Sequence, residues 1–322
     1  DSLRISFRAR MDSTACSATL DGVGSFGTCT NAMHASLSVL AVPVPPANCL
    51  LALHNLDGLW YQEPGAFGVW KPLLCGRFET SRGFGRTPDG TIWVAGLPSF
   101  RLNPYQLSFE IFAPSFGQAL GMDYVYDAAG DPRDSSVVFA GYLSGYGLRL
   151  RRYQPKTGQV SVILDDASPF GVGIGRHVVV ASDGTIGVNN NVGIVRVNPA
   201  NPAGYTVFAP PVGIGVTGLS FDVDGKWLTT TMPVGAGTPR DVMRVDPATG
   251  AYSSILDVHP YVTYYVEVPA IATSPGQDLY FATGDAVYAT VDRAHGNAVT
   301  TTIVPLNITD LMWLGSGSTT AV

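Results

Sequence analysis

Short runs of alternating apolar and polar residues, each followed by a turn sequence, recur along most of the chain. The clearest unit begins at Val216, turns at Asp224-Gly225, and continues through further apolar runs and a second turn, Asp246 to Gly250, as far as Leu256. Alternation with a period of two is typical of β-strands, and Pro followed by Gly suits tight turns. The unit therefore predicts four strands joined by turn, loop and turn.

The first turn of this unit recurs along the chain. Its glycine falls at positions 90, 130, 184, 225, 276 and 317, so successive units lie 40 to 54 residues apart. This is the size of one four-stranded propeller blade. The sequence predicts an all-β fold, a six-bladed β-propeller. A seventh blade around Asn55-Leu56-Asp57-Gly58 stays open, and a β-sandwich with irregular strands is the alternative.

Both ends of the chain are expected to contribute to one blade. The strand that ends near Gly317 has no successors, so residues 36–42 and 50–61 are expected to complete its blade and close the ring. Residues 1–35 fit the repeat poorly. They contain an alternating run from Leu3 to Met11 and a Cys16-to-Cys29 loop. We therefore expect an N-terminal strand and disulfide-pinned appendage at 1–35 and the propeller at 36–322.

The composition agrees with a β-rich fold and disfavours both a nucleic-acid partner and a membrane span. The chain has 37 Gly and 23 Pro but only 3 Lys and 4 Glu, the residues that usually cover exposed helix faces. Its net charge of −6 disfavours nucleic acid as a partner. The most apolar window is interrupted by Pro43, Pro45 and Pro46, so we expect no membrane span.

Four cysteines lie in the first quarter of the chain, at Cys16, Cys29, Cys49 and Cys75. Their spacing matches no common metal or redox motif, and an even, clustered set predicts two disulfides. The chain also begins at Asp1 without Met. We therefore expect a secreted, periplasmic or cell-surface protein, the alternative being four reduced cysteines in the core.

Candidate chemistry follows from the blade pattern, because the first strand of each blade lines the central channel of a propeller. Counting eight and seven residues back from each turn glycine places Arg82, Asp123, Arg176, His177, Thr217 and Asp310 around the channel, with Glu267 one residue before the corresponding pair. Asp123, Glu267 and Asp310 are candidate ligands for Ca²⁺ or another divalent cation. His177, Arg176 and Glu267 are candidate catalytic residues. The alternative is that these side chains form ion pairs with one another.

Aromatic side chains supply candidate ligand contacts. Tyr264, Tyr265 and Tyr124, together with Arg82, are expected near the channel and could bind a small molecule or a glycan, although packing within blades explains most aromatics. The run Gly213-Ile214-Gly215-Val216-Thr217-Gly218 matches a dinucleotide-binding pattern. It leads into a strand instead of a helix, so we expect no nucleotide cofactor.

The turn segments carry a family resemblance. Gly85 to Val94 and Thr217 to Gly225 resemble the blade repeats of the SMP-30/gluconolactonase, NHL and virginiamycin B lyase-like propellers. The resemblance covers about residues 80–317 and implies a six-bladed propeller. In the gluconolactonase-like enzymes it implies an axial divalent metal held by Glu, Asn and Asp, and in the lyase-like members axial His and Glu.

We therefore expect an exported propeller that binds a small ligand in its central channel, as a divalent-metal-dependent hydrolase or lyase. The alternative is a noncatalytic extracellular module that binds glycans or a protein partner. Propellers host both classes, so the sequence leaves open whether the protein is an enzyme.

Overall fold

The computed structural model describes residues 18–26, 29–37, 45–46, 48–54, 58–75, 83–96, 99–106, 108–112, 115–144, 147–165, 177–190, 193–211, 214–233, 241–258, 270–276, 278–282, 286–290, 299–303 and 308–314. Almost all regular structure in these ranges is antiparallel β-sheet, with one short helix, α1 (Phe116–Ala119).

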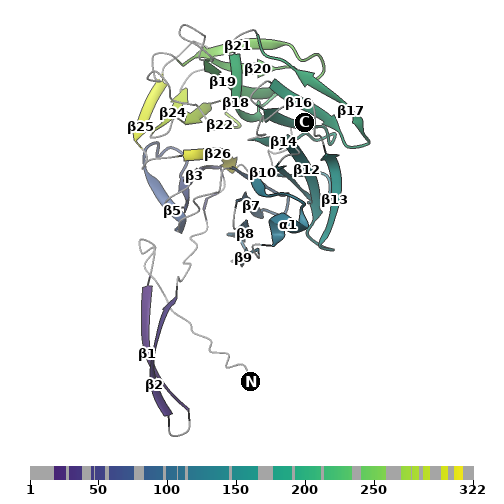
Figure 1. Ribbon diagram of the computed structural model, residues 1–322. Coiled ribbons are helices and arrows are strands. Elements are labelled where there is room, and N and C mark those ends of the chain that lie inside the picture. Colours follow the sequence, from purple (N-terminus) through teal and green to yellow (C-terminus); the bar gives the residue numbers. More distant parts are fainter. Residues whose placement is uncertain are drawn as a thin grey trace.

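Six four-stranded sheets are arranged around a central axis, which confirms the predicted six-bladed propeller (Figure 1). From the axis outward, blades 1 to 3 are β26 (Ile308–Leu314), β3 (Cys49–His54), β4 (Gly58–Gln62), β5 (Trp70–Cys75); β6 (Gly83–Arg86), β7 (Ile92–Ala95), β8 (Phe100–Asn103), β9 (Ser108–Ile111); and β10 (Tyr124–Gly130), β11 (Val137–Leu143), β12 (Gly147–Gln154), β13 (Gln159–Asp165). Blades 4 to 6 are β14 (Val178–Val180), β15 (Ile186–Asn190), β16 (Gly193–Asn198), β17 (Asn201–Phe208); β18 (Ile214–Phe221), β19 (Trp227–Pro233), β20 (Asp241–Val245), β21 (Tyr252–Asp257); and β22 (Ala270–Thr273), β23 (Leu279–Ala282), β24 (Ala286–Thr290), β25 (Val299–Ile303).

Blade 1 combines strands from both ends of the chain, as predicted. β26 pairs with β3, Leu311 lying opposite Ala52, and this pairing closes the ring. The prediction that residues 36–42 join this blade was wrong for Ser36 and Leu37, which pair with β1 instead. The other strands of blade 1 are β4 and β5, and residues 38–42 lie outside the described residues.

A separate two-stranded sheet precedes the propeller, formed by β1 (Ala18–Phe26) and β2 (Cys29–Leu37) and drawn in purple in Figure 1. The strand expected at Leu3 to Met11 and Cys16 lie outside the described residues. Cys49 is buried at the start of β3, and burial raises the pKa of its thiol to about 12. The side chains of Cys29 and Cys75 are not among those described, so the two disulfides stay predictions. The division at residue 35 also stays a prediction, although β2 continues to Leu37.

The core lies between the blades. Six apolar clusters each fill the space between two neighbouring blades, for example around Trp93 between blades 2 and 3 and around Trp227 between blades 4 and 5. Both indoles are almost fully buried. Burial of this apolar surface stabilises the ring, because each sheet covers the next.

Three of the described turns after the inner strands follow one pattern, whereas two do not: Gly276 has no positive φ, and the turn after β10 is longer. Gly90, Gly184 and Gly225 have positive φ, as a tight turn requires. After β10, however, the turn runs from Asp131 to Ser136, and the residue with positive φ is Ser135. Gly130 is the last residue of β10, so its assignment as a turn glycine was wrong.

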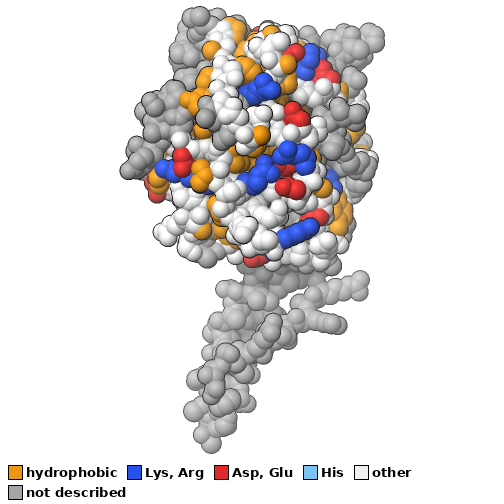
Figure 2. Space-filling view, turned by 90° about the vertical axis from the view of Figure 1, so that its right-hand side faces the viewer, with side chains coloured by type: hydrophobic (Ala, Val, Ile, Leu, Met, Phe, Trp, Pro, Cys, Tyr) orange, Lys and Arg blue, Asp and Glu red, His pale blue; other side chains and the backbone are white. Residues whose placement is uncertain are grey.

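Charged side chains of both signs are mixed on the outer surface. On the face shown in Figure 2, Lys and Arg side chains are scattered among Asp and Glu side chains. Ion pairs such as Arg101 with Glu110 and Arg149 with Asp165 agree with this mixed surface. Within the described part of the chain, no helix has the length and apolarity needed to cross a bilayer.

Candidate metal centre and axial cavity

Three titratable side chains from three blades meet near the axis. Asp127 lies on β10 and Asp310 on β26, and His177 immediately precedes β14. One ligand atom from each lies within 4.8 Å of the others, and all three side chains are buried. His177 Nδ1 is 3.7 Å from Asp127 Oδ2 and 3.9 Å from Asp310 Oδ1. Two carboxylates and an imidazole form a donor set that suits a divalent cation.

Backbone amides hold both carboxylates in place. Asp127 accepts hydrogen bonds from the amide of Ala128 (2.7 Å) and from that of Val178 in the next blade (2.6 Å). Asp310 does the same with Leu311 (2.8 Å) and with Phe84 in the next blade (3.0 Å). Both aspartates lie at β-bulges of their inner strands. Each carboxylate therefore links its blade to the following one in a fixed orientation.

The missing side chain at Gly83 lets the two carboxylates approach. β6 lies between the blades that carry Asp310 and Asp127, and a Cβ atom at Gly83 would lie 2.9 Å from Asp127 Cβ and closer still to its carboxylate. The strand therefore leaves at Gly83 the space that the Asp127 side chain occupies. The cluster depends on this glycine for close approach, not for positive φ.

Burial makes both carboxyl groups unusually weak acids. Burial, and then the neighbouring charge of Asp310, raises the pKa of Asp127 well above its ordinary value, although the amides of Val178 and Ala128 lower it. Burial likewise raises the pKa of Asp310 to about 8, against the opposing effect of the Phe84 and Leu311 amides. Among the described residues, the ion pairs of these two carboxylates involve only His177. Their combined negative charge therefore favours a proton or a cation between them.

Asn189 on β15 positions His177 and connects it to blade 5. The Asn189 Oδ1 atom accepts a hydrogen bond from the His177 amide (2.7 Å), and its Nδ2 atom donates to the Thr217 carbonyl. The hydroxyls of Thr217 and Thr230 are 2.8 Å apart in the same buried region. This polar network fixes the backbone that presents the imidazole.

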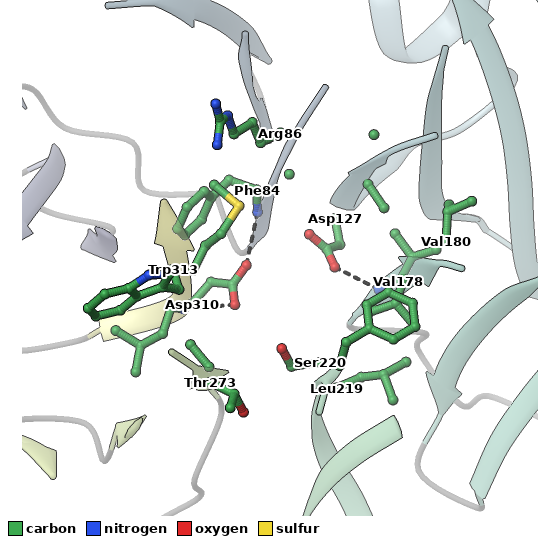
Figure 3. A pocket seen from close by; sticks show the side chains of 18 of the residues that line it. Phe84, Arg86, Asp127, Val178, Val180, Leu219, Ser220, Thr273, Asp310 and Trp313 are labelled. Atoms are coloured by element: carbon green, nitrogen blue, oxygen red, sulfur yellow. Dashed lines mark hydrogen bonds between the residues drawn. The ribbon is translucent and has the colours of Figure 1, made fainter. Parts of the chain in front are cut away.

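A cavity of about 350 Å³ adjoins the carboxylates. Inner strands of all six blades line it, and it extends toward their turns at Val223 and Pro275. Figure 3 shows Asp127 and Asp310 on opposite sides of this space, with Ser220 and Thr273 beside it. Apolar walls with a few polar groups are typical of small-molecule sites, and this volume lies within their usual range.

The structure brings together two of the residues predicted from the sequence, His177 and Asp310. Asp123 lies outside their cluster: its carboxylate is exposed and accepts a hydrogen bond from the Ser144 amide (2.8 Å), which lowers its pKa. Tyr124 is also exposed. The remaining candidates lie outside the described residues, so their roles stay predictions: Arg82, Arg176, Tyr264, Tyr265 and Glu267.

The sequence reasoning missed Asp127, although a signal for it existed. Counting seven residues back from Gly130 selects Asp123, whereas counting eight residues back from Ser135, the residue that occupies the turn position in this longer loop, selects Asp127. The error thus arose from the turn and not from the counting rule.

Comparisons with known proteins agree with the fold. No family model matches the chain, and no curated protein matches it. Among solved structures, TolB from Acinetobacter baumannii superimposes with a TM-score of 0.61 at 15% sequence identity. The match covers 83% of this chain and 66% of TolB, so this chain spans just under two thirds of TolB's length. A gluconolactonase from Xanthomonas campestris gives a TM-score of 0.53 at 13% identity over 84% of each chain. The chain has the gluconolactonase-like propeller fold.

Virginiamycin B lyase from Staphylococcus aureus is also structurally similar, with a TM-score of 0.51 at 14% sequence identity over 76% of each chain. That structure is of a catalytically inactive variant with quinupristin. At these identities the gluconolactonase-like fold is shared, whereas activity has to be argued from the site.

Proposed function

We propose that this propeller binds a divalent cation between Asp127, His177 and Asp310 and a small organic ligand in the adjoining cavity, as an exported cation-dependent hydrolase or lyase. The observation that supports it is the meeting of two buried carboxylates and an imidazole, within 4.8 Å, at the edge of a cavity of about 350 Å³. The clustered cysteines support export.

The residues present fit such a cation. Asp127 and Asp310 would each supply a carboxylate oxygen and His177 its Nδ1 atom, and two positive charges would balance the two buried negative ones. A bound divalent cation supplies Lewis acidity, polarising a carbonyl or stabilising a developing oxyanion. The chain itself contributes rigid ligands, because backbone amides orient both carboxylates before any ligand binds.

The cavity walls would bind and orient the organic ligand. Ser220 and Thr273 line the same cavity as the carboxylates and offer hydroxyls, and Leu219 and Val178 offer apolar contacts. These groups would hold the reacting part of the ligand against the cation and limit access of water. Arg176 and Glu267, predicted from the sequence, remain candidates for proton transfer and oxyanion binding.

A second candidate function follows from the same contacts. Each carboxylate also accepts a hydrogen bond from a backbone amide of the neighbouring blade. In a noncatalytic binding module, the role of the two carboxylates would be to join the blades. The cation-dependent enzyme and the noncatalytic module differ in their need for the His177 imidazole as a cation ligand. A purely structural cluster needs the two carboxylates and not the imidazole.

Cation binding tests the proposal directly. Isothermal titration of the chelator-treated protein with Mg²⁺, Ca²⁺, Mn²⁺ and Zn²⁺ is expected to give one site per chain. His177→Gln is expected to weaken it by about 100-fold, because it removes a ligand yet keeps every carboxylate-to-amide hydrogen bond. Asp183→Asn, an exposed carboxylate in the same blade, is the matched control and is expected to bind as the unmodified protein does.

Two outcomes would reject the metal site: no cation bound by the unmodified protein, or equal affinity in a folded His177→Gln variant. Circular dichroism of each variant reports whether it is folded. A screen of esters and lactones, with and without chelator, then separates an enzyme from a cation-stabilised binding module.

A further inference from the structure

A pair of stacked tyrosines marks the start of β10. The rings of Tyr124 and Tyr126 have centroids 6.1 Å apart and planes within 20° of parallel, and Tyr124 is 47% exposed. Tyr142 lies directly opposite Tyr124 in the ladder between β10 and β11. A stacked pair of tyrosine rings, one of them half exposed, offers a flat apolar face with a polar hydroxyl at its edge to a ligand.

The strand geometry explains why both rings lie on the same side of β10, with Tyr124 exposed and Tyr126 partly buried. Val125, between the two tyrosines, is buried in the core between blades 2 and 3. The alternation of the strand therefore directs Tyr124 and Tyr126 to the other side. The register then shifts between Val125 and Asp127, so Asp127, the residue directly after Tyr126, enters the axial cluster.

A fixed carboxylate lies next to the rings in the chain. Asp123 is exposed, and its side chain is oriented by the Ser144 amide at 2.8 Å. That hydrogen bond also lowers the pKa of Asp123, so the group is an ionised acceptor at neutral pH. An ionised carboxylate accepts strong hydrogen bonds from hydroxyl groups.

We propose that Tyr124, Tyr126 and Asp123 form a binding site for a neutral saccharide. One face of a pyranose ring carries C–H groups that pack on a flat aromatic ring, and its hydroxyls would donate to the Asp123 carboxylate. An anionic sugar or a phosphate would be repelled by this carboxylate. The site uses none of the axial cluster's residues and is therefore independent of the proposed cation chemistry.

The test is a screen of neutral oligosaccharides on an array, followed by titration of the best binder against the full chain. Tyr124→Ala is expected to weaken binding by about tenfold or more, because it removes the exposed stacking face. Tyr105→Ala, a tyrosine of similar exposure (42%) in the turn between β8 and β9, is the matched control and is expected to bind unchanged.

The saccharide site is rejected if the unmodified protein binds no neutral saccharide, or if Tyr124→Ala binds as tightly as Tyr105→Ala. It is supported if affinity falls in Tyr124→Ala and Asp123→Asn while cation binding stays unchanged in Tyr124→Ala. Because His177→Gln is expected to keep its saccharide affinity, failure of the cation site and failure of the saccharide site give different results.

Discussion

Gly83→Ala is expected to abolish cation binding and to lower the free energy of unfolding by about 1–3 kcal/mol. The new methyl group would lie 2.9 Å from Asp127 Cβ and closer still to the carboxylate, so the Asp127 side chain would have to move. Asp127 cannot simply turn away, because it would then lose the amide hydrogen bonds of Ala128 and Val178. Titration calorimetry measures the first effect and urea unfolding the second.

A matched control separates this steric effect from a general cost of replacing glycine. In Gly276→Ala the nearest atom to the added Cβ would be Ser274 Oγ at 3.6 Å, an ordinary contact, and the φ of Gly276 is not positive. We expect this variant to bind the cation as the unmodified protein does. Undiminished cation binding by Gly83→Ala would show that the carboxylate cluster is not the site.

The blades could be predicted from the sequence because their turns contain residue types that tight turns require. Gly90, Gly184 and Gly225 adopt the positive φ that a tight turn needs, and the residues before them alternate as strands do. The closing of blade 1 by strands from both parts of the chain was also predicted, and the pairing of β26 with β3 confirms it. These features depend on local patterns, which a sequence displays directly.

The site could be predicted only in part because a glycine has more than one use. Gly130 has no positive φ; a Cβ there would lie 2.9 Å from Thr87 Cα, so it permits close packing of blades 2 and 3. The turn position is filled by Ser135, with φ of 59°, in a loop one residue longer than its counterparts. A sequence does not distinguish a glycine needed for packing from one needed for a turn. Because of this ambiguity, the sequence pattern pointed to Asp123 instead of Asp127.

The proximity of Asp310 and Asp127 could not have been predicted from their positions in the sequence. They belong to blades on either side of β6, and their approach depends on the space at Gly83. Local patterns place each residue on an inner strand, whereas the distance between inner strands depends on packing between blades.

In the presence of a chelator, the free energy of unfolding is expected to fall as the pH rises from about 5 to 8. The folded state raises the pKa of Asp310 from its ordinary 3.8 to about 8, and that of Asp127 also rises. Within this window the folded state binds more protons than the unfolded state, so each added pH unit costs stability, by at most about 1.4 kcal/mol for each proton. Urea unfolding at several pH values measures the slope.

This slope is opposite to that of ordinary paired carboxylates. Asp131, for example, is buried, yet hydrogen bonds from Arg133 lower its pKa, so its contribution is lost only as the pH falls below about 4. A decline between pH 5 and 8 therefore reports on groups whose pKa is raised. Asp310→Asn, which removes one of the two charges, is expected to flatten it.

Excess divalent cation is expected to remove the decline, because the cation replaces the proton between the carboxylates and binds more tightly as they ionise. At a free concentration 100-fold above its Kd it would add about 2.7 kcal/mol to the free energy of unfolding. A slope that persists unchanged with cation present would mean that the cation binds elsewhere. Stability that is flat or rises from pH 5 to 8 in the chelated protein would mean that the two carboxyl groups are not buried together, and both the cluster and its proposed cation would then be rejected.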